Sequence, residues 1–120
     1  MAYEIPGQMI TLPASTDLTN YQYHFVAITA DGRVDHASAG GAAIGVLQNK
    51  PLENQAASIM VNGVSKIKAA AGNLSEGMLT RSSSEGMAVA STGNGILGTI
   101  IFGSSGGAGR VLSVLLDADG

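Results

Sequence analysis

The residues of this chain that could carry out chemistry are few and stand apart from one another. Among its 120 residues there is no cysteine, and there are only two histidines, His24 and His36. Neither has a second histidine at the spacing of a metal site, and the neighbouring Asp35 points away from His36 if both lie in one strand. We therefore expect no metal centre and no cofactor.

Glycine-rich segments and carboxylates offer no better candidates. Residues 103–109 (GSSGGAG) lead into an apolar run that predicts a strand, whereas a phosphate-binding loop ends in Gly-Lys-Ser/Thr and opens a helix. The nine carboxylates are spread singly, so no pair is set for acid–base work. A small hydrolase would need a buried cleft in which His24 converges with an aspartate and a serine. We expect that the protein is not an enzyme.

The composition predicts a surface that other protein covers. Only 12% of the residues are charged, about half the usual share, while 17 are glycine. Charged groups are depleted at the centres of interfaces because desolvating them is costly. A net charge of −3 and six scattered basic residues argue against nucleic-acid binding, which needs clustered Lys and Arg.

No segment predicts export or membrane insertion. Residues 1–13 lack a basic stretch followed by an apolar one, and no apolar run approaches the roughly 18 residues that span a bilayer. We expect a soluble protein that is synthesised in the cytoplasm and has no membrane partner.

Turn signals divide the chain into short strands. Residues 1–20 contain two prolines and many turn formers, and predict an irregular N-terminal arm that is either disordered or ordered by a partner. Residues 21–28 predict a strand whose Tyr21, Tyr23 and Phe25 line a core-facing side. An Asp-Gly turn then predicts a hairpin into residues 33–37.

Three further patterns shape the second half. Asn62-Gly63 lies between two β-prone runs and predicts a hairpin, because both central residues of a type I′ turn need φ > 0. The tetrapeptide Ser-Glu-Gly-Met occurs at residues 75–78 and 84–87 and predicts two successive turns of a meander. Residues 96–102 and 111–116 are apolar on both alternating faces, which predicts central strands that are buried on both sides.

Eight or nine short strands with closely spaced turns indicate an all-β fold. We expect a small single-domain sandwich or tulip-like barrel of antiparallel strands, with residues 1–20 as the arm and residues 21–120 as the β domain.

Several blocks in this order resemble one known family, the capsid cement or head decoration proteins of tailed bacteriophages. The resemblance extends from about residue 14 to 116 and departs from the family at residues 52–54 (LEN), where Ala-Gly is common. The blocks that carry it are DL at 17–18, QYHFV at 22–26, DGRV at 31–34, AIGVLQNKP at 43–51 and VNGVSK at 61–66.

The resemblance implies a β-rich accessory protein on the outer surface of the expanded phage head. Relatives stabilise contacts between major capsid proteins, often as homotrimers, so we expect the major capsid protein as partner, a homotrimer, and a virion location. The alternative is a virion surface module that binds host carbohydrate or another receptor. That function would need an exposed aromatic cluster.

We predict that the arm and the Asn62-Gly63 hairpin supply the contacts to the capsid or to other subunits, because an arm can order on binding and reach beyond the globular body. The predicted contact residues are Tyr3, Ile5, Pro6, Met9, Ile10, Leu12, Asn62, Lys66 and Lys68.

Overall fold

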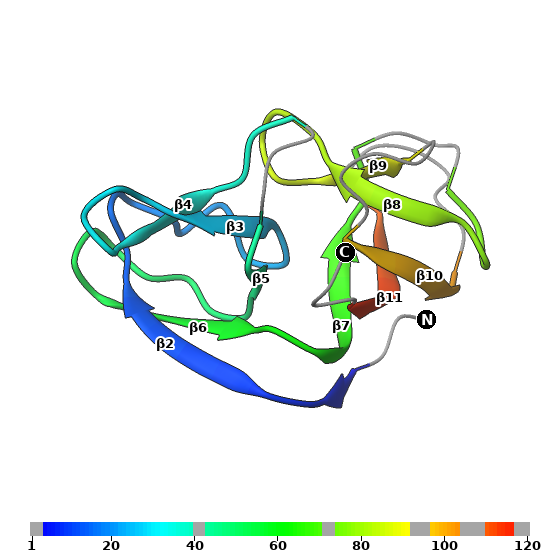
Figure 1. The fold of residues 1–120 in the computed structure, drawn as a ribbon, viewed down its shortest axis with the longest axis horizontal. Helices are drawn as coiled ribbons and strands as arrows, with labels where there is room; N and C mark the ends of the chain where they lie inside the picture. Colours follow the sequence, from blue (N-terminus) through cyan, green and yellow to red (C-terminus); the bar gives the residue numbers. More distant parts are fainter. Residues whose placement is uncertain (1–3, 40–42, 71–73, 92–96, 104–109, 117–120) are drawn as a thin grey trace.

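The chain folds into two antiparallel β-sheets that lie side by side (Figure 1). The computed structural model describes residues 4–39, 43–70, 74–91, 97–103 and 110–116, and these contain strands and turns but no helix. No helix in this part of the chain is therefore available to cross a membrane. The predicted fold class is confirmed: the protein is all-β, with two antiparallel sheets in a sandwich-like arrangement.

The first, N-terminal sheet has five strands, in the order β2-β6-β5-β3-β4. Its strands are β2 (Met9–Pro13), β3 (Phe25–Ile28), β4 (Val34–His36), β5 (Gly45–Leu47) and β6 (Ala56–Met60). The second, C-terminal sheet has six, in the order β1-β7-β11-β10-β8-β9. Its strands are β1 (Ile5–Pro6), β7 (Gly63–Lys68), β8 (Leu79–Ser82), β9 (Ala88–Ala90), β10 (Gly98–Phe102) and β11 (Val111–Leu116).

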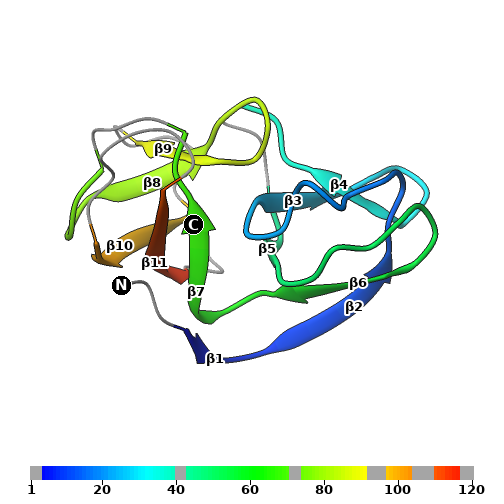
Figure 2. The ribbon, with the colours of Figure 1, turned by 180° about the vertical axis from the view of Figure 1, so that it is seen from behind.

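The two sheets repeat one topology. When each strand of the N-terminal sheet is replaced by the strand five places later in the chain, its order becomes β7-β11-β10-β8-β9, which is the order of the C-terminal sheet without β1. Each sheet also curls until the ends of its repeated strand set meet at one parallel bridge: Ala14 after β2 meets Val34 of β4, and Ala69 after β7 meets Ala88 of β9. The chain is thus built from two structural repeats, which Figures 1 and 2 show from opposite sides.

The repetition extends to the turns. The β3–β4 turn (residues 29–33) and the β8–β9 turn (residues 83–87) are each closed by a backbone hydrogen bond of 2.7 Å from the first N–H to the last carbonyl. The hydroxyl of the first residue accepts the N–H of the last in both turns, at 3.2 and 3.1 Å. Gly32 and Gly86 take up the left-handed backbone, with φ of 81° and 82°. Both turns thus use one local design, a hydroxyl residue followed three places later by glycine.

Two apolar clusters hold the fold. The barrel core lies inside the curled N-terminal sheet and consists of Ala14, Leu18, Val26, Val34, Leu47, Ala57 and Ile59. The interface core joins the repeats: Phe25, Ala37, Val46 and Met60 of the first pack with Ile67, Ala69, Leu74, Ala88, Ile100, Leu112, Val114 and Leu116 of the second.

The predicted hairpin at Asn62-Gly63 is wrong. The residues on its two sides belong to different sheets, since β6 is in the first and β7 in the second. Gly63 has a φ of 94°, but Asn62 is not among the residues of positive φ, so the pair does not form a type I′ turn. Here the chain crosses from one repeat to the other.

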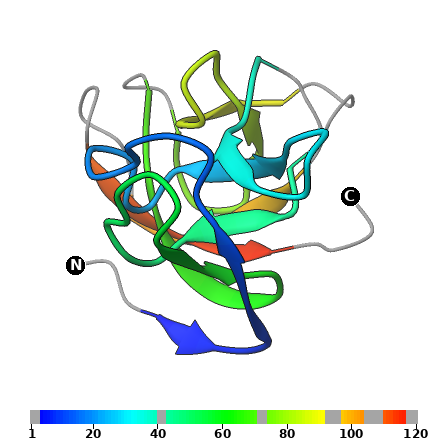
Figure 3. The ribbon, with the colours of Figure 1, turned by 90° about the vertical axis from the view of Figure 1, so that its left-hand side faces the viewer.

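The predicted irregular arm is also wrong for residues 5–13. β2 pairs with β6 along five residues, and β1 pairs with the beginning of β7. Figure 3, which views the first repeat end-on, shows this N-terminal segment (blue) running beside the strands. Pro6 and Pro13 are compatible with these strands because β1 and β2 are edge strands, where a residue without an N–H is tolerated.

The strand predicted at residues 21–28 begins only at Phe25. Tyr23 has a φ of 65°, so residues 21–24 form a turn and the three aromatic residues do not share one face. Phe25 is buried in the interface core as predicted, while Tyr21 and Tyr23 are half-buried. The two Ser-Glu-Gly-Met segments do lie at successive turns, before β8 and between β8 and β9.

Candidate interaction surface

A row of mostly apolar side chains crosses the outer face of the C-terminal sheet. The strand register places Ile5 opposite Val64, Val64 opposite Leu115, Leu115 opposite Thr99, and Thr99 opposite Leu79. Residues directly opposite in antiparallel strands point to the same face, so these five form one continuous row, the apolar row. Ile5, Leu115 and Leu79 are 58, 47 and 40% exposed, while Val64 between Ile5 and Leu115 is buried.

Two lysines flank this row. Lys66 lies opposite Ser113, and Lys68 lies opposite Val111, so both point to the same outer face as the row. The Lys66 ammonium is 5.7 Å from the centre of the Tyr23 ring, a cation–π distance. The outer face of this sheet therefore combines exposed aliphatic groups with two half-buried positive charges, a mixture suited to contact with protein.

The structure brings some of the predicted contact residues to this surface. Ile5 is its most exposed apolar member, and Lys66 and Lys68 border it. Pro6 follows in β1, and Tyr3 lies outside the described residues.

The other predicted contact residues lie elsewhere. Met9 is 43% exposed, on the outer face of the N-terminal sheet. Ile10 and Leu12 are only partly buried, but they pack against the barrel core. Asn62 ties the N-terminal segment to the crossover: the Gln8 N–H donates to its Oδ1 at 2.6 Å. Their predicted role in contacts stays a prediction.

Sequence reasoning missed Leu79 and Leu115. β10 and β11 are central strands, as predicted for this part of the chain, although Ile96 lies outside the described residues. Their burial on both faces is not found, because Val111 and Leu115 are more than a third exposed. The sequence feature that pointed to such an exposed apolar surface was the low share of charged residues, which indicated a surface covered by other protein.

The histidines lie where the two repeats meet. His24 is 5% exposed, and its Nδ1–H donates to the Glu85 carbonyl at 2.7 Å. The Tyr21 ring packs edge-on against it at 5.1 Å and stacks on the His36 ring at 4.7 Å. Burial lowers the pKa of His24, and the charges of Lys68 and His36 lower it further. No three His, Cys, Asp or Glu residues in the described ranges are grouped to hold a metal.

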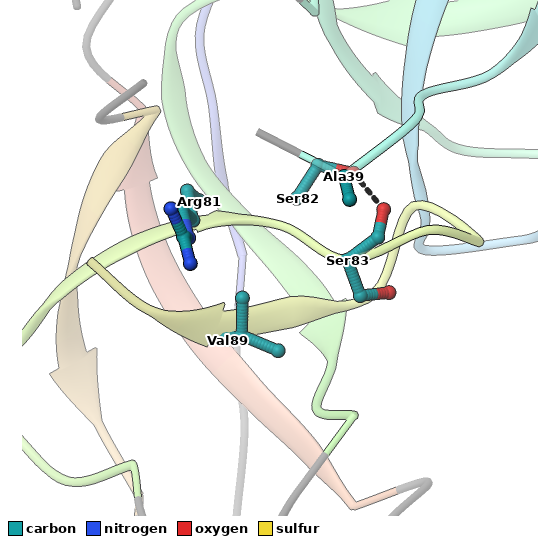
Figure 4. A pocket seen from close by; sticks show the side chains of 5 residues that line it. All are labelled: Ala39, Arg81, Ser82, Ser83 and Val89. Carbon is teal, nitrogen blue, oxygen red and sulfur yellow. Dashed lines mark hydrogen bonds between the residues drawn. The ribbon is translucent and has the colours of Figure 1, made fainter. Parts of the chain in front are cut away.

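An open hollow lies beside β8 and β9 (Figure 4). It has a volume of about 260 Å³ and is lined by Ala39, Arg81, Ser82, Ser83 and Val89. Both serine hydroxyls in this hollow form hydrogen bonds with the backbone. The Ser82 hydroxyl donates to the Ser83 carbonyl, and the Ser83 hydroxyl accepts the Met87 N–H. A lone guanidinium without a carboxylate or histidine provides no acid–base pair.

Fold and surface together define a two-repeat all-β module with an apolar outer face. Its fold is similar to that of a solved structure, "the crystal structure of head fiber gp8.5 N base in bacteriophage phi29". The TM-score is 0.70 and the sequence identity is 12%, over 92% of this chain and 94% of that one. At this identity the likeness shows the fold. No protein-family model and no curated protein matches the sequence.

Proposed function

We propose that this chain is a structural protein of a tailed-bacteriophage head, and that it binds the outer surface of the expanded shell as a decoration, or cement, protein. The observation that carries the proposal is the fold likeness to a phage head fibre base, which covers nearly the whole of both chains. The sequence resemblance to capsid decoration proteins supports the same role.

The physical character of the molecule agrees with this role. Stabilising contacts between major capsid proteins requires a stable body and a complementary surface, and no bond need be made or broken. Lys66 and Lys68 supply positive charge for docking onto the capsid, and the apolar row beside them supplies aliphatic area for contact between neighbouring copies. Attachment of several copies, proposed here as a homotrimer, would raise the avidity of modest individual contacts.

The test is binding to capsids. Purified protein is mixed with expanded, DNA-free capsids of its own phage, sedimented, and the pellet is assayed for the protein; capsids of an unrelated phage serve as control. We expect saturable co-sedimentation with the first and none with the second, together with a higher melting temperature of the decorated capsid. Absence of co-sedimentation at saturating protein would refute the proposal.

A receptor-binding module remains the second candidate, because Tyr21 and Tyr23 are half-exposed. Their rings are already engaged, one by His36 and the other by Lys66, which leaves less aromatic face for a sugar. Binding of the protein to a glycan array, with loss of that signal in Tyr23→Ala, would favour this candidate over the decoration role.

A further inference from the structure

The apolar row has a counterpart in the first repeat, and there it is covered. The corresponding register positions on the outer face of the N-terminal sheet are Met9, Met60, Val46 and Phe25. We call these four residues the inner row, because the second repeat covers most of them. Phe25, Val46 and Met60 are at most 2% exposed and belong to the interface core, where they pack against the second repeat. The same strand positions thus form an interface in the first repeat, whereas in the second repeat Leu115 and Leu79 are exposed and only Val64 is buried.

The β8–β9 turn seats on the end of the inner row. The Phe25 N–H donates to the Gly86 carbonyl at 2.6 Å, and the His24 ring donates to the Glu85 carbonyl. The fit is close, since a Cβ added at Gly86 would lie 2.5 Å from the Phe25 carbonyl oxygen.

The counterpart of this turn, the β3–β4 turn, has the same conformation and is open. A Cβ added at Gly32 would meet nothing within 4 Å, and Asp31 and Gly32 are exposed. The neighbouring Ile28 is 53% exposed. One molecule therefore carries a row with three exposed members on the second repeat and an open turn on the first, which correspond to the two sides of the interface inside the chain.

We infer that these two surfaces bind each other between copies of this chain. The β3–β4 turn of one copy seats on the apolar row of the next, with Gly32 against Met78 and Leu79, as Gly86 seats against His24 and Phe25 within the chain. Such a contact joins different surfaces, so its repetition closes into a ring or extends as a filament, depending on the rotation per copy. The occupant is a second copy because the internal interface shows that a repeat of this fold complements the row.

This inference specifies how copies associate within the proposed function, and it is tested without capsids. A failure to assemble and a failure to bind capsids are therefore separate results.

Sedimentation velocity of the isolated protein, up to high micromolar concentration, measures the assembly. Leu79→Asp and Leu115→Asp place a charge in the row, and Gly32→Asn places a side chain on the turn in a residue type that tolerates positive φ. Leu52→Asp is the matched control, because Leu52 is an exposed leucine (50%) outside both surfaces. Cooperative melting checks that each variant is folded.

We expect the wild type and Leu52→Asp to self-associate, and the row and turn variants each to be monomeric. A mixture of a row variant and Gly32→Asn keeps one intact row and one intact turn, so it should form one-to-one dimers and nothing larger. Wild type that stays monomeric throughout the range overturns the inference. Loss of assembly in the row variants but not in folded Gly32→Asn also overturns it, because the row would then bind a second row.

Discussion

Gly32 and Gly86 occupy equivalent turns with nearly equal φ, yet only Gly86 has another part of the chain packed on it. A substitution at Gly32 therefore measures only the free-energy cost of the left-handed backbone. The same substitution at Gly86 adds the cost of placing atoms in the interface between the repeats.

Alanine at position 32 should cost roughly 1–2 kcal/mol of unfolding free energy, because it must adopt a left-handed backbone. Alanine at position 86 should cost a further amount on the order of 2 kcal/mol, since its Cβ also overlaps the Phe25 carbonyl oxygen. Denaturant unfolding of the two variants checks this. Equal losses would show that the turn is not seated as described.

His24 should make the fold less stable in mild acid. Its pKa is lowered in the folded state, chiefly by burial, so the unfolded chain binds more protons in the window just below the ordinary histidine pKa of 6.5. Stability is then complete above this value and decreases as the pH falls below it. The charges of Lys68 and His36 add to the effect, while the Glu85 carbonyl, which accepts the ring N–H, and the Glu85 charge oppose it.

The measurement is the denaturation midpoint between pH 8 and 5, compared with His24→Asn. Asparagine keeps a donor for the Glu85 carbonyl and does not titrate. We expect a flatter pH profile for the variant. An unchanged profile would show that His24 is not the source of the pH dependence.

Truncation should show that folding does not require the edge strand β1 but does require the rest of the N-terminal segment. Removal of residues 1–7 deletes a two-residue pairing and should leave cooperative unfolding. Removal of residues 1–20 also deletes β2 and the fully buried Ala14 and Leu18, and burial of one leucine alone is worth about 1.5–3 kcal/mol. We expect the longer deletion to unfold the protein, as read by circular dichroism and melting. A folded product would mean that the barrel core closes without this segment.

The lysines beside the apolar row should contribute to capsid binding. Lys66→Glu and Lys68→Glu reverse charge on the proposed docking face, and we expect weaker co-sedimentation with expanded capsids, with the largest deficit at low salt. Lys50→Glu is the control, because Lys50 is exposed and lies outside the C-terminal sheet. Equal binding by all three variants would remove the lysines from the contact.

The sequence by itself determined the fold class and most of the turns. Alternating short runs and Asp-Gly or Glu-Gly turns are local signals, and the structure follows them at residues 29–33 and 83–87 because the turn chemistry acts within a few residues. Scarce charge likewise indicated a covered surface. These properties do not depend on which strands meet.

Only the tertiary structure decided the pairing of strands and which apolar face stays open. Asn62-Gly63 specifies a change of direction, but long-range packing sends its two sides into different sheets. The two structural repeats could not be recognised from the sequence, because equivalent positions such as Phe25 and Leu79 occupy the same place in the strand register but hold different residues. Leu115 belonged to a run that is apolar on both faces, and a sequence pattern cannot show that Leu115 itself stays exposed.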